Sequence, residues 1–180
     1  AFRLAHAEQP FPGTVGLHIS GDPSMLAFKS AFSSAVYAGY PYAKVRGIPG
    51  VEGDVALNAQ IPGPPARDDR PEPEGEVRSL HVHLSGTTAR LVWRTPSEKD
   101  APESVVSSAL LASAVCEQWA TQGAHKLASD RKLDQAVLHV PNDERLAVLA
   151  PAISALRACK RPLDGEPSPI SVFTLTFAMN

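Results

Sequence analysis

A proline-rich segment in the first half of the chain limits the fold more than any other sequence feature. Residues 62–76 (PGPPARDDRPEPEGE) hold five of the chain's 17 prolines and no aliphatic side chain larger than alanine. Proline removes a backbone donor and biases the preceding residue toward extended backbone, so this segment predicts neither a helix nor a central strand. Such a long connection is uncommon inside a compact domain unless it is disordered or docks onto a surface. We therefore expect a single domain over residues 1–180, with this excursion between two sub-lobes at 1–61 and 77–180.

The composition favours a globular protein over a disordered, nucleic-acid-binding or membrane-spanning one. Of the 180 residues, 43% are hydrophobic and 20% are charged, with a net charge of −2. No basic cluster marks a DNA-binding face, and no apolar run approaches the roughly 18 residues of a transmembrane helix. We expect a soluble protein that binds neither DNA nor membranes. Because the chain starts at Ala1 and not at Met, we expect a processed product or a piece of a longer polypeptide.

Before the proline-rich segment, the pattern of apolar residues predicts the order β-α-β-β. A strand is expected at 14–20, because its side chains change character at every second position. Asp22 and Pro23 then supply an N-cap oxygen and a proline suited to the first helical turn. The helix they begin carries apolar side chains at steps of three and four residues and ends at Gly39. Extended segments at 42–46 and 54–60 follow.

After the proline-rich segment, the pattern predicts the order β-β-α-β-α-β, without a fixed-period repeat. The expected elements are a hairpin of strands at 79–85 and 89–94, a helix opening at Pro102, a strand at 136–140, a helix kinked or delayed by Pro151, and a half-buried strand at 170–177. Hairpins combined with β-α alternation favour an α/β (α+β) fold. We expect a two-layer sandwich in which helices cover one face of a mixed or mainly antiparallel sheet.

Cys116 and Cys159 are the only cysteines in the chain. Two cysteines in a chain of this length cannot form the dense disulfide framework of a small secreted scaffold. We expect two buried thiols, with a disulfide as the alternative. Cys116 falls on the apolar stripe of the predicted helix, a position that indicates packing rather than a nucleophile.

Two predicted strands end in a similar pattern, LHIS at 17–20 and VHLS at 82–85. Alternation places His18 beside Ser20, and His83 beside Ser85, on one side of each strand. If these strands were neighbours, one imidazole could accept a proton while the other donates one, and both serines could bind a phosphate. A histidine on the solvated face of a strand also needs no function.

In this pattern the chain resembles the two-histidine phosphoesterase family, whose signature is a hydrophobic-His-hydrophobic-Ser/Thr motif that occurs twice. The resemblance covers about ten residues. It implies that His18 and His83 act as the catalytic acid and base, and that Ser20 and Ser85 hold the phosphate. A metal cluster of His81, His83 and His18 is a weaker alternative, because no carboxylate or cysteine stands at a supporting spacing. We expect no metal and no cofactor.

The sequence favours a non-enzymatic role as a structural or assembly subunit that packs against copies of itself or a larger scaffold. It carries no strong active-site motif, and its C-terminal strand at 170–177 predicts an edge that a neighbouring subunit covers. Viral shells and organelle complexes use such segments, so a capsid-associated role fits. The alternative is a phosphoesterase acting on a cyclic nucleotide or an RNA-end phosphate, the one case that implies a small phosphate ligand. A third interpretation is a peptide-binding module whose ligand is the segment 62–76.

Overall fold

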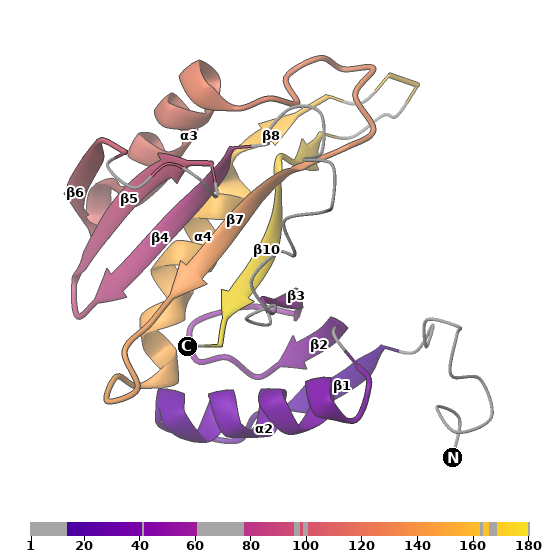
Figure 1. Cartoon of the computed structure of the whole chain (residues 1–180), viewed down its shortest axis with the longest axis vertical. Helices are drawn as coiled ribbons and strands as arrows, with labels where there is room; N and C mark the ends of the chain where they lie inside the picture. The colour runs from indigo at the N-terminus through magenta and orange to yellow at the C-terminus, as the bar shows by residue number, and fades with distance from the viewer. Residues whose placement is uncertain are drawn as a thin grey trace, which may run out of the picture.

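Eight strands from both sides of the proline-rich segment form one mixed sheet (Figure 1). The computed structural model describes residues 14–40, 42–60, 78–95, 98, 101–162, 164–165 and 169–179, so the predicted excursion at 62–76 lies outside the described residues. From one edge to the other the strands are β1 (Val15–His18), β2 (Tyr42–Arg46), β3 (Asp54–Gln60), β10 (Phe173–Ala178), β7 (Asp134–His139), β4 (Ser79–Ser85), β5 (Thr88–Arg94) and β6 (Glu103–Ser107).

Helices cover one face of this sheet. They are α2 (Met25–Tyr37), α3 (Leu111–Gln122) and α4 (Leu149–Ala158), and the 3₁₀ turns η1 (Ser108–Leu110) and η2 (Leu146–Val148) precede α3 and α4. A separate pair of short strands, β8 (Lys160–Arg161) and β9 (Ile170–Ser171), lies between α4 and β10 in the chain. No helix within the described ranges is long and apolar enough to cross a membrane. The predicted fold class, an α+β two-layer sandwich with a mixed sheet, is confirmed.

The core lies between the helices and the sheet. On β4, Leu80, Val82 and Leu84 point into it, and Ile153 and Leu156 of α4 are buried in the same cluster. Burying one such side chain stabilises the fold by about 1.5–3 kcal/mol. The hairpin of β4 and β5 and its division into an apolar face and a histidine face are as the alternation predicts.

The start of α2 differs in detail from the sequence pattern. Ser24, not Asp22, caps α2, because its hydroxyl accepts a hydrogen bond from the Ala27 amide (3.2 Å). The Asp22 carboxylate instead accepts from the distant Ala147 amide (2.9 Å). Gly39, with a φ of 101°, terminates α2 as predicted. Pro151 lies in the first turn of α4, which confirms the predicted delayed start.

The predicted helix opening at Pro102 is wrong over its first turns. Residues Glu103–Ser107 form β6, which pairs antiparallel with β5, and the α-helix begins only at Leu111. Val105 and Val106 are β-branched and favour a strand once a partner ladder is available. The helix therefore begins later than the apolar spacing indicated, and the residues that it buries are Leu111 and Val115.

The C-terminal strand is a second correction. β10 does not lie at an edge but at the centre of the sheet, parallel to both β3 and β7. Phe173 and Phe177 on this strand are buried by the chain's own core. This strand therefore needs no neighbouring subunit to cover it.

Two β-α-β units stand out in the topology: β1-α2-β2 and β7-α4-β10, each joining two parallel, hydrogen-bonded strands through one helix. Their strand-to-helix loops lie against each other, since the Met25 amide donates to the Glu144 carbonyl (2.8 Å) and the Leu146 amide donates to the Pro23 carbonyl (2.9 Å). The two units are thus joined directly at their helix starts as well as through the sheet.

A disulfide joins Cys116 on α3 to Cys159, the residue after α4, with the two Cα atoms 5.3 Å apart. The expectation of two free buried thiols is therefore wrong, and the alternative holds. The helical stripe does place Cys116 inward, as predicted, but it faces the end of α4 and not apolar side chains alone. The bond fixes two of the three helices to each other.

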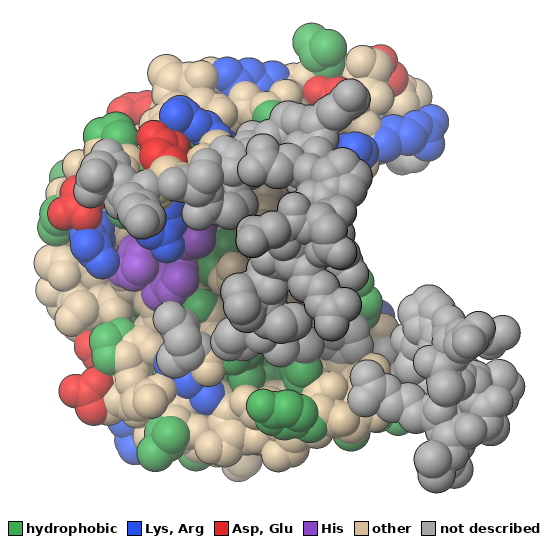
Figure 2. All heavy atoms as spheres, viewed as in Figure 1, with side chains coloured by type: hydrophobic (Ala, Val, Ile, Leu, Met, Phe, Trp, Pro, Cys, Tyr) green, Lys and Arg blue, Asp and Glu red, His purple; other side chains and the backbone are tan. Residues whose placement is uncertain are grey.

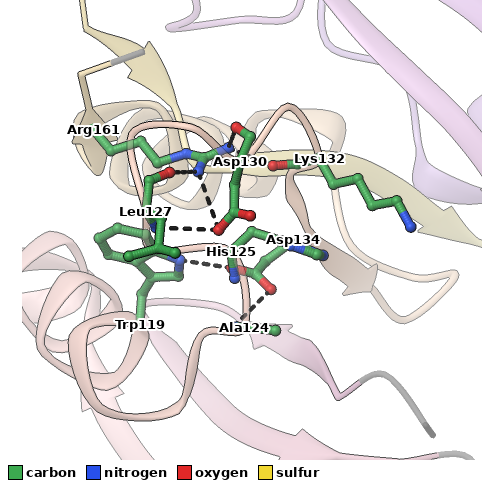
Figure 3. A network of polar contacts seen from close by, with 8 residues as sticks. All are labelled: Trp119, Ala124, His125, Leu127, Asp130, Lys132, Asp134 and Arg161. Atoms are coloured by element: carbon green, nitrogen blue, oxygen red, sulfur yellow. Dashed lines mark hydrogen bonds and ion pairs between the residues drawn. The ribbon is translucent and has the colours of Figure 1, made fainter. Parts of the chain in front are cut away.

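A network of polar contacts holds the loop between α3 and β7 (Figure 3). The buried carboxylate of Asp134 accepts hydrogen bonds from the Trp119 indole (2.8 Å) and the Ala124 amide (3.1 Å). Arg161 of β8 donates to backbone carbonyls of the same loop, those of Leu127, Asp130 and Lys132. Because a buried charge is tolerated when it is hydrogen-bonded, we assign this network a structural role.

Candidate metal centre

Three histidines lie together on the sheet face opposite the helices. His81 and His83 belong to β4, and His139 ends β7, the parallel neighbour of β4. In this pairing His83 is opposite His139 and His81 is opposite Val137, so all four side chains point to one side, here called the histidine face. Figure 2 shows the histidines as one patch, flanked by basic and acidic side chains.

The three imidazoles are stacked with His139 in the middle. The His83 and His139 rings have centroids 4.2 Å apart and an interplanar angle of 12°, and the His81 and His139 centroids are 5.1 Å apart. One ring nitrogen from each residue lies within 4.8 Å of the other two. Three potential ligand atoms are therefore gathered from two strands without any carboxylate or thiolate in this group.

Hydrogen bonds orient two of the rings. His81 Nδ1 and His139 Nε2 are 2.8 Å apart, and His81 Nε2 is 3.1 Å from the Ser79 hydroxyl. In each of these two contacts one atom donates and the other accepts, and the tautomers of the histidines decide which. Ser79 thus fixes the ring of His81 from the side away from His139, as groups around metal-binding histidines commonly do.

All three imidazoles are kept neutral. Burial lowers the pKa of His139 to about 3, helped by the charges of His83 and His81, and lowers the pKa of His81 to about 4, helped by Arg94. The pKa of His83 is lowered as well, first by burial and then by Arg90. A neutral imidazole offers a lone pair, which is the form that binds a metal ion.

A cavity of about 410 Å³ opens beside two of the histidines. Its walls include His83 and His139 from the cluster, together with Ser85, Arg90 and Val105. His81 is only 8% exposed and is not among the lining residues. The cluster is therefore accessible from one side, through His83 and His139.

The donor set fits a divalent transition metal. Imidazole nitrogens suit zinc, copper and nickel, whereas calcium and magnesium require oxygen ligands. Two nitrogens bound to one tetrahedral zinc at 2.0–2.1 Å lie about 3.3 Å apart. His81 and His139 are closer than this and the full set is wider, so binding requires ring rotations that shift the nitrogens by roughly an ångström.

The two predicted phosphoesterase motifs do not meet. His18 is an exposed residue of β1 at one edge of the sheet, and Ser20 follows it. Four strands separate β1 from β4, which at about 4.8 Å per step places His18 roughly 24 Å from His83. His83 and Ser85, in contrast, line one cavity as their spacing predicts. The second motif therefore borders this cavity, and the first motif lies far from it.

The predicted metal cluster of His81, His83 and His18 agrees better with the structure. Two of its three residues are in the observed cluster, and His139 takes the place of His18. The sequence does carry a signal for His139: Leu138-His139-Val140 repeats the hydrophobic-His-hydrophobic pattern. Pro141 stands where the other two copies have serine, so a search for the full motif misses it. Only the parallel pairing of β7 with β4, which the sequence does not reveal, shows that the third copy brings His139 beside His83.

Comparison with known proteins adds no relative from which a role could be transferred. No family model, no curated protein and no solved structure matches this chain.

Proposed function

We propose that this protein binds a divalent transition-metal ion, zinc in the first instance, through His81, His83 and His139. The observation that carries the proposal is the gathering of three ring nitrogens within 4.8 Å of one another. Zinc commonly takes three protein ligands and leaves one position for water or another ligand. Hydrogen bonding of His81 to Ser79 supports the proposal, because it holds one ligand in place before the ion arrives.

The electrostatic surroundings keep the cluster neutral, which leaves the imidazole lone pairs available to a metal ion. Protonating these imidazoles would place positive charge beside Arg90 and Arg94, which both act against it. Neutral imidazoles release few protons on binding at pH 7, so little of the binding free energy is lost to deprotonation. Lys29 is not a competing ligand, since its ammonium donates to the Val140 carbonyl (2.8 Å).

Isothermal titration of the metal-free protein with zinc tests the proposal, and His18 supplies a matched control. We expect one ion per chain, and we expect His139→Ala to weaken binding roughly 100-fold or more, because losing a ligand costs at least as much as losing a residue that orients a ligand. His18→Ala removes a histidine from the same Leu-His-aliphatic context and should leave the affinity unchanged. Equal affinities for the two variants would overturn the proposal.

We propose assembly with a second copy of the chain as a separate role, supported by the free edge of β6. Among the described strands only β5 pairs with β6, and Val105 on it is 67% exposed. Two copies of β6 could pair antiparallel around a two-fold axis and extend the sheet. The capsid-associated role, in contrast, has lost its main support, because β10 needs no partner subunit.

Light scattering at micromolar concentration tests the assembly role. We expect a mass of twice 19.1 kDa for the wild type and a monomer for Val105→Lys, which places a charge at the shared edge. Leu127→Lys is the matched control, because Leu127 is equally exposed but lies in the loop before β7. A wild-type protein that stays monomeric, with or without zinc, rules this role out.

A further inference from the structure

We infer that the metal ion presents its open position to the cavity and there binds the phosphate group of a small phosphate monoester, with Arg90 as the second anchor. This inference rests on the proposed function. It concerns the next ligand of the same site, which no comparison assigns.

Access to the bound ion is one-sided. His81 is almost fully buried, whereas His83 and His139 form part of the cavity wall. An ion held by all three must therefore direct any remaining coordination position toward the cavity. The volume of about 410 Å³ is well above that of a single phosphate ion and falls in the range of small-molecule sites. The cavity therefore fits a phosphate attached to a small organic group.

Charge at the cavity selects an anion. Neutral imidazoles leave the full charge of the metal ion uncompensated, and no acidic side chain is among the described residues that line the cavity. Arg90 is opposite His83 in the β4–β5 ladder and lines the same cavity. Its Nη1 atom is 2.9 Å from Glu103 Oε2, in a pair whose two side chains are about half exposed. An exposed pair of this kind is weak, so Arg90 can turn to a phosphate oxygen.

Hydroxyl groups distinguish phosphate from a simple carboxylate. Ser85 and Thr88 both line the cavity, and Thr88 Oγ1 already donates to the Ser85 carbonyl (3.0 Å). Because the Thr88 hydroxyl is already engaged, the Ser85 hydroxyl is the one left to donate to a ligand. A phosphate monoester has three non-bridging oxygens, one each for the metal, Arg90 and Ser85, whereas a carboxylate has only two oxygens. The phosphate-holding role predicted for Ser85 from its spacing to His83 is thus kept, with Arg90 and the metal in place of the second motif.

Cobalt(II) provides the test, because its visible absorption reports both its binding and a change of its fourth ligand. The cobalt-loaded full chain is titrated with phenyl phosphate, with inorganic phosphate in parallel. We expect a saturable spectral change, tighter for phenyl phosphate than for inorganic phosphate because the cavity also contacts the organic group. Arg90→Gln should weaken phenyl phosphate binding about 10-fold or more, measured on protein that is saturated with cobalt. Glu103→Gln frees Arg90 and should tighten phenyl phosphate by about two- to tenfold.

Arg46→Gln is the matched control, because Arg46 also forms an exposed ion pair, with Asp54 (2.6 Å), but at the far side of the sheet. Its phenyl phosphate affinity should equal that of the wild type. A protein that fails to bind cobalt contradicts the proposed function itself. Cobalt binding without a spectral response to either phosphate, or equal phosphate affinity of Arg90→Gln and Arg46→Gln, overturns this inference and leaves the metal site intact.

Discussion

The two β-α-β units of this protein share a local pattern but differ in what surrounds it. In each, the first strand ends in Leu-His-aliphatic, and an aspartate follows four residues after the histidine: Asp22 after His18, and Asp143 after His139. His18 lies on an edge strand and is exposed, whereas His139 lies on a central strand next to β4 and contacts His81 and His83. The neighbouring strand, and not the motif, makes a histidine part of a site.

The two units also differ in how they are attached to the rest of the fold. The second unit carries a covalent tie, because Cys159 follows α4 and is bonded to Cys116 on α3. The first unit depends on packing: Phe28 of α2 meets Phe177 of β10 in an edge-to-face contact with centroids 5.4 Å apart. One attachment is covalent and the other is entirely noncovalent. We therefore expect a reductant to weaken only the covalent attachment and the removal of a packed side chain to weaken only the noncovalent one.

The largest effect is expected from removing the packing contact of the first unit. Phe28→Ala leaves a cavity at a residue that is 2% exposed and should lower the free energy of unfolding by about 3–5 kcal/mol. Tyr37→Ala, on the same helix but 82% exposed, should change it by about 0.5 kcal/mol or less. Urea denaturation measures both. Similar losses for the two variants would show that α2 does not anchor the first unit in this way.

Removing the covalent tie of the second unit comes next. The disulfide closes a segment with a sequence separation of 43, and its loss should cost about 2–4 kcal/mol through the freedom gained by the unfolded chain. We expect Cys116→Ala/Cys159→Ala to unfold at lower urea, and a reductant to destabilise the wild type but not this variant. If the wild type is insensitive to reductant under denaturing conditions, the bond is not formed in the protein.

Zinc should stabilise the folded protein through His139 of the second unit and not through His18 of the first. At a free zinc concentration about 100 times the dissociation constant, the wild type gains about 2.7 kcal/mol. For a chain of this size that corresponds to a rise of roughly 5–10 °C in Tm. Calorimetry should show the rise for His18→Ala and not for His139→Ala. A zinc-induced rise that survives His139→Ala would remove the difference between the two units.

The smallest effect is the share of a single histidine in the pH dependence of the metal-free protein. His81 and His139 have pKa values of about 4 and about 3 when folded, below the ordinary 6.5. The unfolded chain therefore binds more protons below pH 6.5, and stability falls as the pH drops from 6.5 toward 4. Between pH 7 and 5 each of the two should cost roughly 1–2 kcal/mol. Urea denaturation of His139→Gln should show a shallower slope over this range, and His18→Gln the wild-type slope.

Local features of the fold follow from the sequence because they depend on neighbouring residues. The alternation of residues 79–85 correctly separates Leu80, Val82 and Leu84 from His81 and His83, and a short turn joins this strand to β5. The apolar spacing of α2 likewise identifies the side it buries. Such patterns report which face of an element is covered, whatever covers it.

Strand neighbours do not follow from the sequence, and the candidate site depends on them. Alternation places His83 on the histidine face of β4, but it does not determine whether β1 or β7 lies beside β4. The two copies of the motif that share a serine contain His18 and His83, but four strands separate β1 from β4. The copy that contains His139 lies next to β4 and lacks the serine. β6 was missed for a related reason, since Val105 and Val106 fit a helical stripe as well as a strand until β5 is present to pair with them.

The central position of β10 has a consequence for biosynthesis. On the ribosome this strand emerges after every other strand of the large sheet, yet among the described strands it alone joins the β1-β2-β3 block to the β7-β4-β5-β6 block. The side of β3 that pairs with β10, where Asn58 is opposite Thr176, therefore stays unpaired until the end of synthesis. Until then the nascent chain carries two unpaired strand edges, one on β3 and one on β7. Intermediates with such edges are bound by chaperones and aggregate when chaperones are scarce.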